Sequence, residues 1–132
     1  MKKLSMLLIS SSLFCYSAMA QVVVVVHPAM NETITKDDIA RLYTGRSTVL
    51  QPIQLKESDS KRAVFDEKGI GRSSSQLKAY WSKLVFTGKG TPPPEVGSDA
   101  EVIQFISSNE YGIGYIDAAS VNDKVKVLMT LD

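Results

Sequence analysis

The sequence predicts an α/β domain in which helices cover both faces of a sheet. Residues 22–26 are five consecutive valines, and an unbroken run of β-branched residues is typical of a strand that is covered on both faces. Four amphipathic segments with helix-start signals follow, and short apolar runs separate them. This interleaving of helices and strands is the α/β pattern, so we expect the valine run to be a central strand.

The first twenty residues read as a secretory signal and are expected to be absent from the folded domain. Lys2 and Lys3 precede an apolar stretch that is too short to span a bilayer as a permanent anchor, and residues 18–20 form a small-residue cleavage site. Cleavage after Ala20 would leave Gln21 as the first residue of a periplasmic or secreted protein. The single cysteine, Cys15, lies within the signal, so the exported chain is expected to contain no disulfide.

The expected mature chain, residues 21–132, has the size of one domain. Loss of Lys2 and Lys3 changes the balance from 15 basic and 14 acidic side chains to 13 and 14, a net charge of −1. The basic residues are scattered among carboxylates and form no block. We therefore expect no nucleic-acid partner.

Three of the four predicted helices begin with capping-box spacing, in which a Ser or Thr stands three residues before an acidic or amide side chain. The pairs are Thr35 with Asp38, Ser73 with Gln76, and Ser98 with Glu101. The remaining helix is expected to open in the polar segment 56–62 and to end near Gly69 or Gly71.

Three further strands are expected, around residues 53–55, 112–116 and 125–129. The strand at 112–116 contains Gly112 and Gly114, and glycines inside a strand usually mark a place where other backbone or a ligand comes close. The prolines at 92–94 predict an extended loop, because they fix φ and supply no hydrogen-bond donors.

Most catalytic chemistries lack the necessary residues. His27 is the only histidine, it precedes a proline at the end of a strand, and a structural role fits it better than metal binding or catalysis. The segment 87–90 superficially resembles a phosphate-binding loop but lacks both the leading glycine and the Ser or Thr after the lysine. We expect no enzyme, no metal and no cofactor.

Anion binding at a helix start is the chemistry that the residues do support. The first turn of a helix presents unpaired N–H groups and a partial positive charge. The first candidate site comprises Ser58, Asp59, Ser60 and Arg62, and the secondary candidate comprises Arg72 and Ser73. The alternative interpretation is that Ser58 and Ser73 are ordinary N-caps, each contributing about 1 kcal/mol.

The chain resembles the phosphate ABC-transporter substrate-binding proteins, and in particular their short, single-lobe members. Four segments carry the resemblance: the valine strand with Pro28, "TKDDIARLYTG" at 35–45, "QLKAYWSKLVFTGKGTPP" at 76–93, and "GIGYIDAASV" at 112–121. The resemblance implies a single periplasmic-binding-protein-like lobe, with a mixed and mostly parallel sheet flanked by helices. It also implies that phosphate or a similar oxyanion binds at the turn of residues 58–61, with Arg62 on the following helix.

Two interpretations of function remain open. The first is an exported oxyanion-binding protein related to phosphate ABC transport, with an ABC permease as a partner. The second is a sensory, assembly or interaction protein of the cell envelope built on a lone lobe. In either case two copies could pair, so that each supplies the other with a missing wall.

Overall fold

The valine run forms the strand β1 (Val22–Val26), and all five side chains are buried. The computed structural model describes residues 21–132, so the predicted signal peptide lies outside the described residues. In the four-stranded sheet the order is β2-β5-β1-β6, which places β1 between two neighbours. The prediction of a central strand is confirmed.

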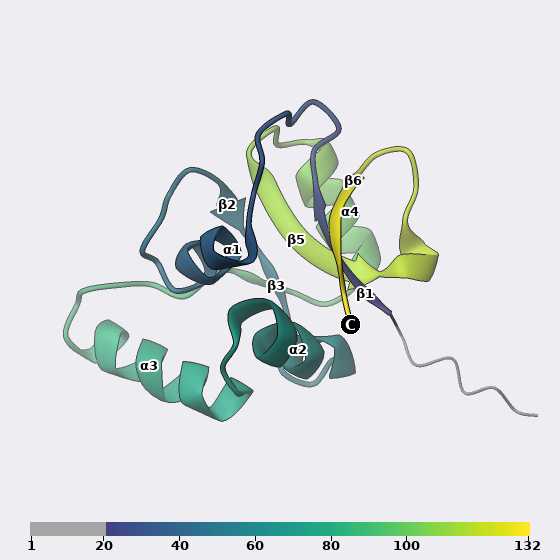
Figure 1. The fold of residues 1–132 in the computed structure, drawn as a ribbon. Helices are drawn as coiled ribbons and strands as arrows, with labels where there is room; N and C mark the ends of the chain where they lie inside the picture. The colour runs from purple at the N-terminus through teal and green to yellow at the C-terminus, as the bar shows by residue number, and fades with distance from the viewer. Residues whose placement is uncertain (1–20) are drawn as a thin grey trace, which may run out of the picture.

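Five further strands follow β1 along the chain (Figure 1). They are β2 (Gln51–Pro52), β3 (Gln54–Leu55), β4 (Glu95–Val96), β5 (Gly112–Asp117) and β6 (Lys126–Leu131). The strand predicted around residues 53–55 corresponds to β3, which pairs with β4, whereas β2 lies just before it and pairs with β5 in the larger sheet.

The α/β class and the mixed sheet flanked by helices are confirmed, but the expectation of mostly parallel pairing is wrong. The antiparallel ladders of β1 with β5 and with β6 join five residue pairs each, whereas the two parallel ladders join two each. An apolar run predicts burial on both faces and carries no information on strand direction. Direction is set by the path of the connecting segments.

The helices are α1 (Lys36–Tyr43), α2 (Ser60–Phe65), α3 (Ser74–Phe86) and α4 (Asp99–Ser107), with a π-helical turn at Asp66–Ile70 and a 3₁₀ turn at Ala118–Ser120. The capping boxes of α1 and α3 form as predicted. At α4 the box is only half formed: the Ser98 side chain accepts from the Glu101 amide, but Glu101 Oε2 accepts from the Gly97 amide. None of the helices in residues 21–132 has the length and apolarity needed to cross a bilayer.

The sheet is covered on both faces by helices, which contact successive residues of β5. A Cβ on Gly114 would lie 2.7 Å from Val102 of α4, so the missing side chain allows this helix to approach closely. The next residue, Tyr115, stacks on Phe65 of α2 with ring centroids 3.9 Å apart. Since successive strand residues point to opposite faces, α4 and α2 lie on opposite sides of the sheet. The β5 glycines thus mark close helix packing.

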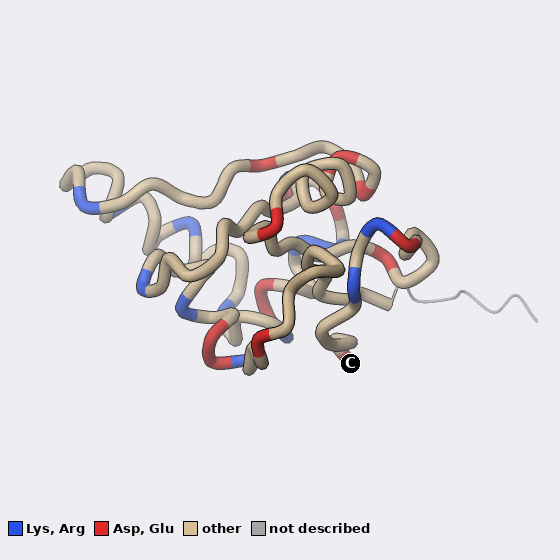
Figure 2. Tube along the Cα trace, turned by 90° about the horizontal axis from the view of Figure 1, so that it is seen from above, with Lys and Arg blue, Asp and Glu red and all other residues tan. Residues whose placement is uncertain are grey.

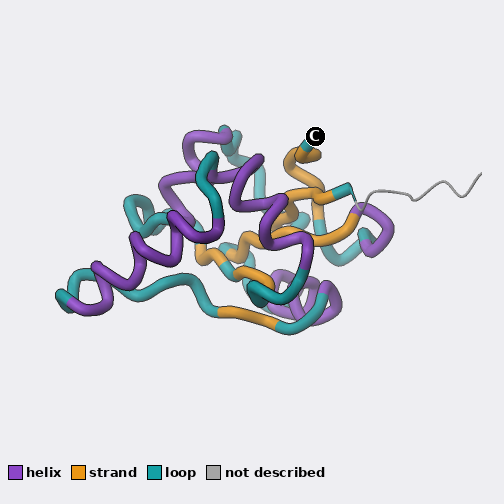
Figure 3. The backbone as a smooth tube through the Cα atoms, turned by 90° about the horizontal axis from the view of Figure 1, so that it is seen from below, coloured by secondary structure: helices purple, strands orange, loops and turns teal. Residues whose placement is uncertain are grey.

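The helix α3 projects from this body, and a long loop returns from its end to β4 (Figure 3). Leu77 and Trp81 are its buried side chains, and the Tyr80 hydroxyl donates to the Thr44 carbonyl at 2.6 Å. At the far end Val85 is 53% exposed and Phe86 92% exposed. Only the first half of the helix is therefore anchored to the rest of the domain.

Candidate functional site

The start of α2, where the sequence predicts an anion site, is capped by Asp59. The Asp59 carboxylate accepts from the Lys61 amide at 3.0 Å, and the Asp59 carbonyl accepts from the Arg62 amide at 3.0 Å. Ser58 is therefore not the N-cap of this helix. The position that an anion would take at this first turn is held by a carboxylate of the chain itself.

The Lys61 side chain adds to this arrangement. Its ammonium lies 3.1 Å from Asp59 Oδ1 and 3.6 Å from Asp99 Oδ1. Burial lowers the pKa of Lys61, but the two carboxylates outweigh burial and raise the pKa above its ordinary value. Ser58 and Ser60 are exposed, and no hydrogen bond within residues 21–132 involves either hydroxyl. The helix start thus offers two free hydroxyls beside a neutralised cation.

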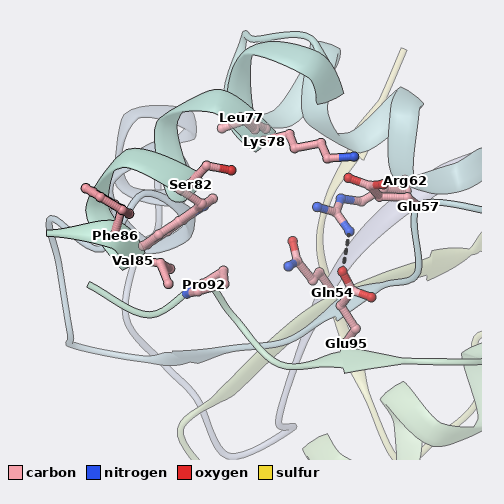
Figure 4. A pocket seen from close by; sticks show the side chains of 11 residues that line it. Gln54, Glu57, Arg62, Leu77, Lys78, Ser82, Val85, Phe86, Pro92 and Glu95 are labelled. Atoms are coloured by element: carbon pink, nitrogen blue, oxygen red, sulfur yellow. Dashed lines mark ion pairs between the residues drawn. The ribbon is translucent and has the colours of Figure 1, made fainter. Parts of the chain in front are cut away.

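Arg62 points away from this turn and into a cavity (Figure 4), and it is 6% exposed. Its Nη1 donates to the Leu55 carbonyl at 2.8 Å and lies 3.6 Å from Glu95 Oε1. Its Nε donates to Asp66 Oδ2 at 3.2 Å. Among the described residues Nη2 has no hydrogen-bond partner, so a buried guanidinium keeps one edge free.

Asp66 contacts the Nε of Arg62 and holds its guanidinium in place. It is fully buried, and its Oδ2 also accepts from the Ser74 hydroxyl at 2.6 Å. Burial raises the pKa of the Asp66 carboxyl, while the hydrogen bonds from Ser74 and Arg62 act in the opposite direction. The pair fixes the guanidinium in one orientation and offsets its charge on the side away from the cavity.

The cavity beside Arg62, here called the Arg62 pocket, has a volume of about 450 Å³. Its lining comprises Gln54, Glu57, Arg62, Leu77, Lys78, Trp81, Ser82, Val85, Phe86, Pro92 and Glu95. Figure 4 shows the polar groups gathered at one end, with Lys78 extended toward them, and Phe86, Val85 and Pro92 at the other. A mostly apolar lining with a few convergent polar groups is typical of small-molecule sites.

Two consecutive segments of the chain that contribute to the pocket lining carry opposite charge, and Figure 2 shows where the charged residues lie along the chain. Residues 68–94, which contain α3, carry five basic side chains and no acidic one: Lys68, Arg72, Lys78, Lys83 and Lys89. Residues 95–123, which begin with β4, carry six acidic side chains and no basic one: Glu95, Asp99, Glu101, Glu110, Asp117 and Asp123. A ligand in the pocket would meet Lys78 on one side and Glu95 on the other.

The secondary candidate, Arg72 with Ser73, does not join this pocket. The Ser73 hydroxyl accepts from the Gln76 amide at 3.2 Å, and Gln76 Oε1 accepts from the Ser73 amide at 2.9 Å. The Arg72 guanidinium lies over the Tyr80 ring, 5.3 Å from its centroid. The cap interpretation is therefore correct for Ser73, and Arg72 packs on the surface of α3.

The sequence interpretation missed the residues that surround Arg62. Lys78 and Ser82 are one helical turn apart on α3, so the periodicity of that helix places them on one stripe. Gln54 and Glu95 are directly paired between β3 and β4, 41 positions apart in the chain. No local signal predicts that pairing, and Ser58, Asp59 and Ser60, which are adjacent to Arg62 in sequence, do not line the pocket.

A second cavity of about 550 Å³ lies between the end of α1 and the proline segment, and no charged side chain lines it. Residues 21–132 contain no group of three or more His, Cys, Asp or Glu side chains placed to hold a metal ion. His27 accepts from the Ala29 amide through Nδ1 at 3.1 Å, and this bond orders the turn after β1. The Arg62 pocket is thus the cavity with the chemistry for an anion.

Comparison with known proteins finds structural neighbours but no match to a family model or to a curated protein sequence. An ABC-type phosphate transport receptor from Vibrio cholerae is 17% identical with a TM-score of 0.63, and the match covers 83% of this chain and 45% of the receptor. A candidate phosphate ABC transporter substrate-binding protein from Clostridium perfringens, solved with bound phosphate, is 17% identical with a TM-score of 0.65, over 82% of this chain and 44% of that one.

PstS from Borrelia burgdorferi gives a similar result, with 17% identity, a TM-score of 0.59, and coverage of 82% of this chain and 46% of its own. At this identity the comparisons establish a shared fold, which is the lobe type that the sequence resemblance implies. The chain spans less than half the length of these neighbours.

Proposed function

We propose that this chain is an exported solute-binding lobe that holds phosphate or a similar oxyanion, with Arg62 as its anchor. The observation that carries the proposal is the buried Arg62 guanidinium, which Asp66 and Leu55 fix in place, which lines the cavity, and whose Nη2 has no hydrogen-bond partner within residues 21–132. Lys78 and Ser82 are further donors in the lining. The phosphate-related descriptions of the structural neighbours support this ligand class.

The proposal moves the ligand from the helix start to the pocket. Ser58 and Ser60 remain the alternative contacts, with Asp59 as an acceptor for a protonated oxyanion. The two placements of the ligand predict different effects of mutation. Lys78→Met should weaken anion binding if the anion lies in the pocket, and a Ser58→Ala/Ser60→Ala double variant should weaken it if the anion lies at the helix start.

The test is a calorimetric titration of the exported protein with phosphate, sulfate and acetate. Trp81 is the only tryptophan and lines the pocket, so its fluorescence provides a second signal. We expect Lys78→Met to weaken binding by roughly tenfold, which is about 1.4 kcal/mol. Lys124→Met, an exposed lysine outside the pocket lining, is the matched control. No heat and no fluorescence change at millimolar concentrations of all three ions would refute the proposal.

Export itself is proposed from the sequence of residues 1–20. The protein recovered from outside the cytoplasm should begin at Gln21 when its N-terminus is determined. An intact Met1 in that fraction, or recovery only from the cytoplasm, would contradict this part.

A second candidate function is a partner-binding protein of the cell envelope, and the exposed end of α3 favours it. Phe86 is 92% exposed beside Val85, which is 53% exposed, and apolar groups at a helix end suit a protein interface. A permease or another envelope protein retained by the wild type should be lost with Phe86→Ser. Sedimentation of the wild type and of Phe86→Ser tests whether the partner is a second copy of this chain.

A further inference from the structure

We infer that the Arg62 pocket binds a zwitterion with an apolar body, of the class of α-amino acids with apolar side chains. The inference rests on the proposed function, because it keeps the same pocket as the solute site and Arg62 as the anchor of an oxyanion, and it specifies this oxyanion as the carboxylate of an organic zwitterion instead of inorganic phosphate. It follows from the charge balance of the lining, from the spacing of its opposite charges and from the apolar end of the cavity.

The charge balance disfavours an inorganic polyanion. The pocket lining has two cationic side chains, Arg62 and Lys78, and two carboxylates, Glu57 and Glu95. The charge of Arg62 is already offset by Asp66, which contacts its Nε at 3.2 Å. A phosphate ion would therefore enter a site whose net charge is already negative. A cation would be opposed by Arg62 and Lys78, whereas a ligand that carries both charges can satisfy both sets.

The opposite charges in the wall are adjacent. Arg62 Nη1 lies 3.6 Å from Glu95 Oε1, and this ion pair leaves Nη2 without a partner within residues 21–132. An α-amino acid also carries its carboxylate and ammonium on one carbon. A carboxylate placed on the Nη2 edge, with Lys78 near it, would bring its ammonium toward Glu95, whose side chain is 47% exposed and free to adjust.

The other end of the pocket suits an apolar side chain. Leu77, Trp81, Val85, Phe86 and Pro92 line it, and Figure 4 shows Val85, Phe86 and Pro92 away from the charged groups. Phosphate offers nothing that these side chains can cover. A ligand that extends from Arg62 toward Phe86 would bury apolar surface on both partners, including the exposed Phe86 ring.

The test compares five probes on the exported protein by calorimetry: L-phenylalanine, 3-phenylpropionate, 2-phenylethylamine, glycine and inorganic phosphate. The second, third and fourth probes lack, in turn, the ammonium, the carboxylate and the apolar body of the first. We expect L-phenylalanine to bind at least tenfold more tightly than each of the other four.

The variant Glu95→Gln sharpens the test, and Glu110→Gln, an exposed glutamate outside the pocket lining, is its control. Glu95→Gln should weaken the binding of L-phenylalanine by roughly tenfold, because it removes the attraction between the Glu95 carboxylate and the ligand ammonium. It should strengthen the binding of 3-phenylpropionate, because it removes the repulsion between the two carboxylates. Weakening of both ligands alike, or of neither, would overturn the assignment of the ammonium to Glu95.

The outcomes separate the two levels of the account. Tighter binding of phosphate or 3-phenylpropionate than of L-phenylalanine overturns this inference and leaves the proposed oxyanion function standing. No binding of any probe overturns both. Tight binding of 2-phenylethylamine alone also overturns both, since it would make the carboxylates and not Arg62 the anchor.

Discussion

Two phenylalanines at the ends of helices, Phe65 in α2 and Phe86 in α3, show how different the two halves of this domain are. Phe65 is fully buried, stacked at 3.9 Å on Tyr115 and edge-on at 4.6 Å to Tyr43. Phe86 is 92% exposed. Phe86 stands four residues after Ser82 and eight after Lys78, on the polar stripe of α3, whereas the buried side chains of that helix, Leu77 and Trp81, lie on another face. The sheet half is built for stability, and the α3 half leaves surface free for contacts.

The largest expected effect comes from truncating each ring in turn. Phe65→Ala should lower the free energy of unfolding by about 4 kcal/mol, because it opens a cavity between two aromatic rings. Phe86→Ala makes the same chemical change and should alter it by less than about 0.5 kcal/mol. Urea unfolding followed by circular dichroism measures both free energies of unfolding. Equal losses of stability would mean that the end of α3 is packed against the rest of the domain.

The next effect concerns the close approach of α4 to the sheet. Gly114→Ala should cost about 2 kcal/mol, because the new Cβ would lie 2.7 Å from Val102 Cγ1. At Gly97 an added Cβ meets nothing closer than 3.6 Å, so Gly97→Ala should have little effect in the same unfolding assay. An unchanged free energy of unfolding for Gly114→Ala would contradict the tight packing of α4 against the sheet.

A smaller effect should be confined to the helix α3. Tyr80→Phe removes the hydrogen bond from the Tyr80 hydroxyl to the Thr44 carbonyl and should cost about 1 kcal/mol. Hydrogen exchange should become faster in α3 and remain unchanged in β1 and β5. Equal acceleration in the strands would mean that the two halves open as one unit.

The smallest effect depends on pH and lies at the start of α1. Hydrogen bonds from the Thr35 amide and hydroxyl hold the pKa of Asp38 below its ordinary value, with a smaller contribution from Arg41. A lowered folded-state pKa means that Asp38 stabilises the fold above its unfolded pKa, about 3.9, and that this contribution is lost as the pH falls through the folded value.

The measurement for this prediction is the urea midpoint of the wild type and of Asp38→Asn. The variant should be less stable at pH 7, and the difference should shrink toward pH 3. Asp37→Asn is the control, since its carboxylate makes no hydrogen bond within residues 21–132. A difference that persists unchanged at pH 3 would contradict the assignment.

The sequence predicts the local features of this fold well and its pairings poorly. The buried valine strand, the capping boxes of α1 and α3 and the β5 glycines follow from short-range rules that hold wherever the segment lies. Strand direction and the Gln54–Glu95 pairing depend on how distant segments meet, which no short-range pattern encodes. At the candidate site, the sequence predicts Arg62 but not its orientation, because the expected N-cap is Ser58 and not Asp59, and the partners that orient the guanidinium, Asp66 and Leu55, are not marked by any local pattern.

The central claim is that solute binds in the pocket beside Arg62, and NMR mapping of the ¹⁵N-labelled exported protein tests it most directly. Titration with L-phenylalanine and, separately, with phosphate should shift the amide resonances of Gln54, Lys78, Ser82 and Glu95 for whichever ligand binds. Those of Ser58 and Ser60 should shift far less. Shifts centred on Ser58 and Ser60, or no shifts with either ligand, would contradict the account.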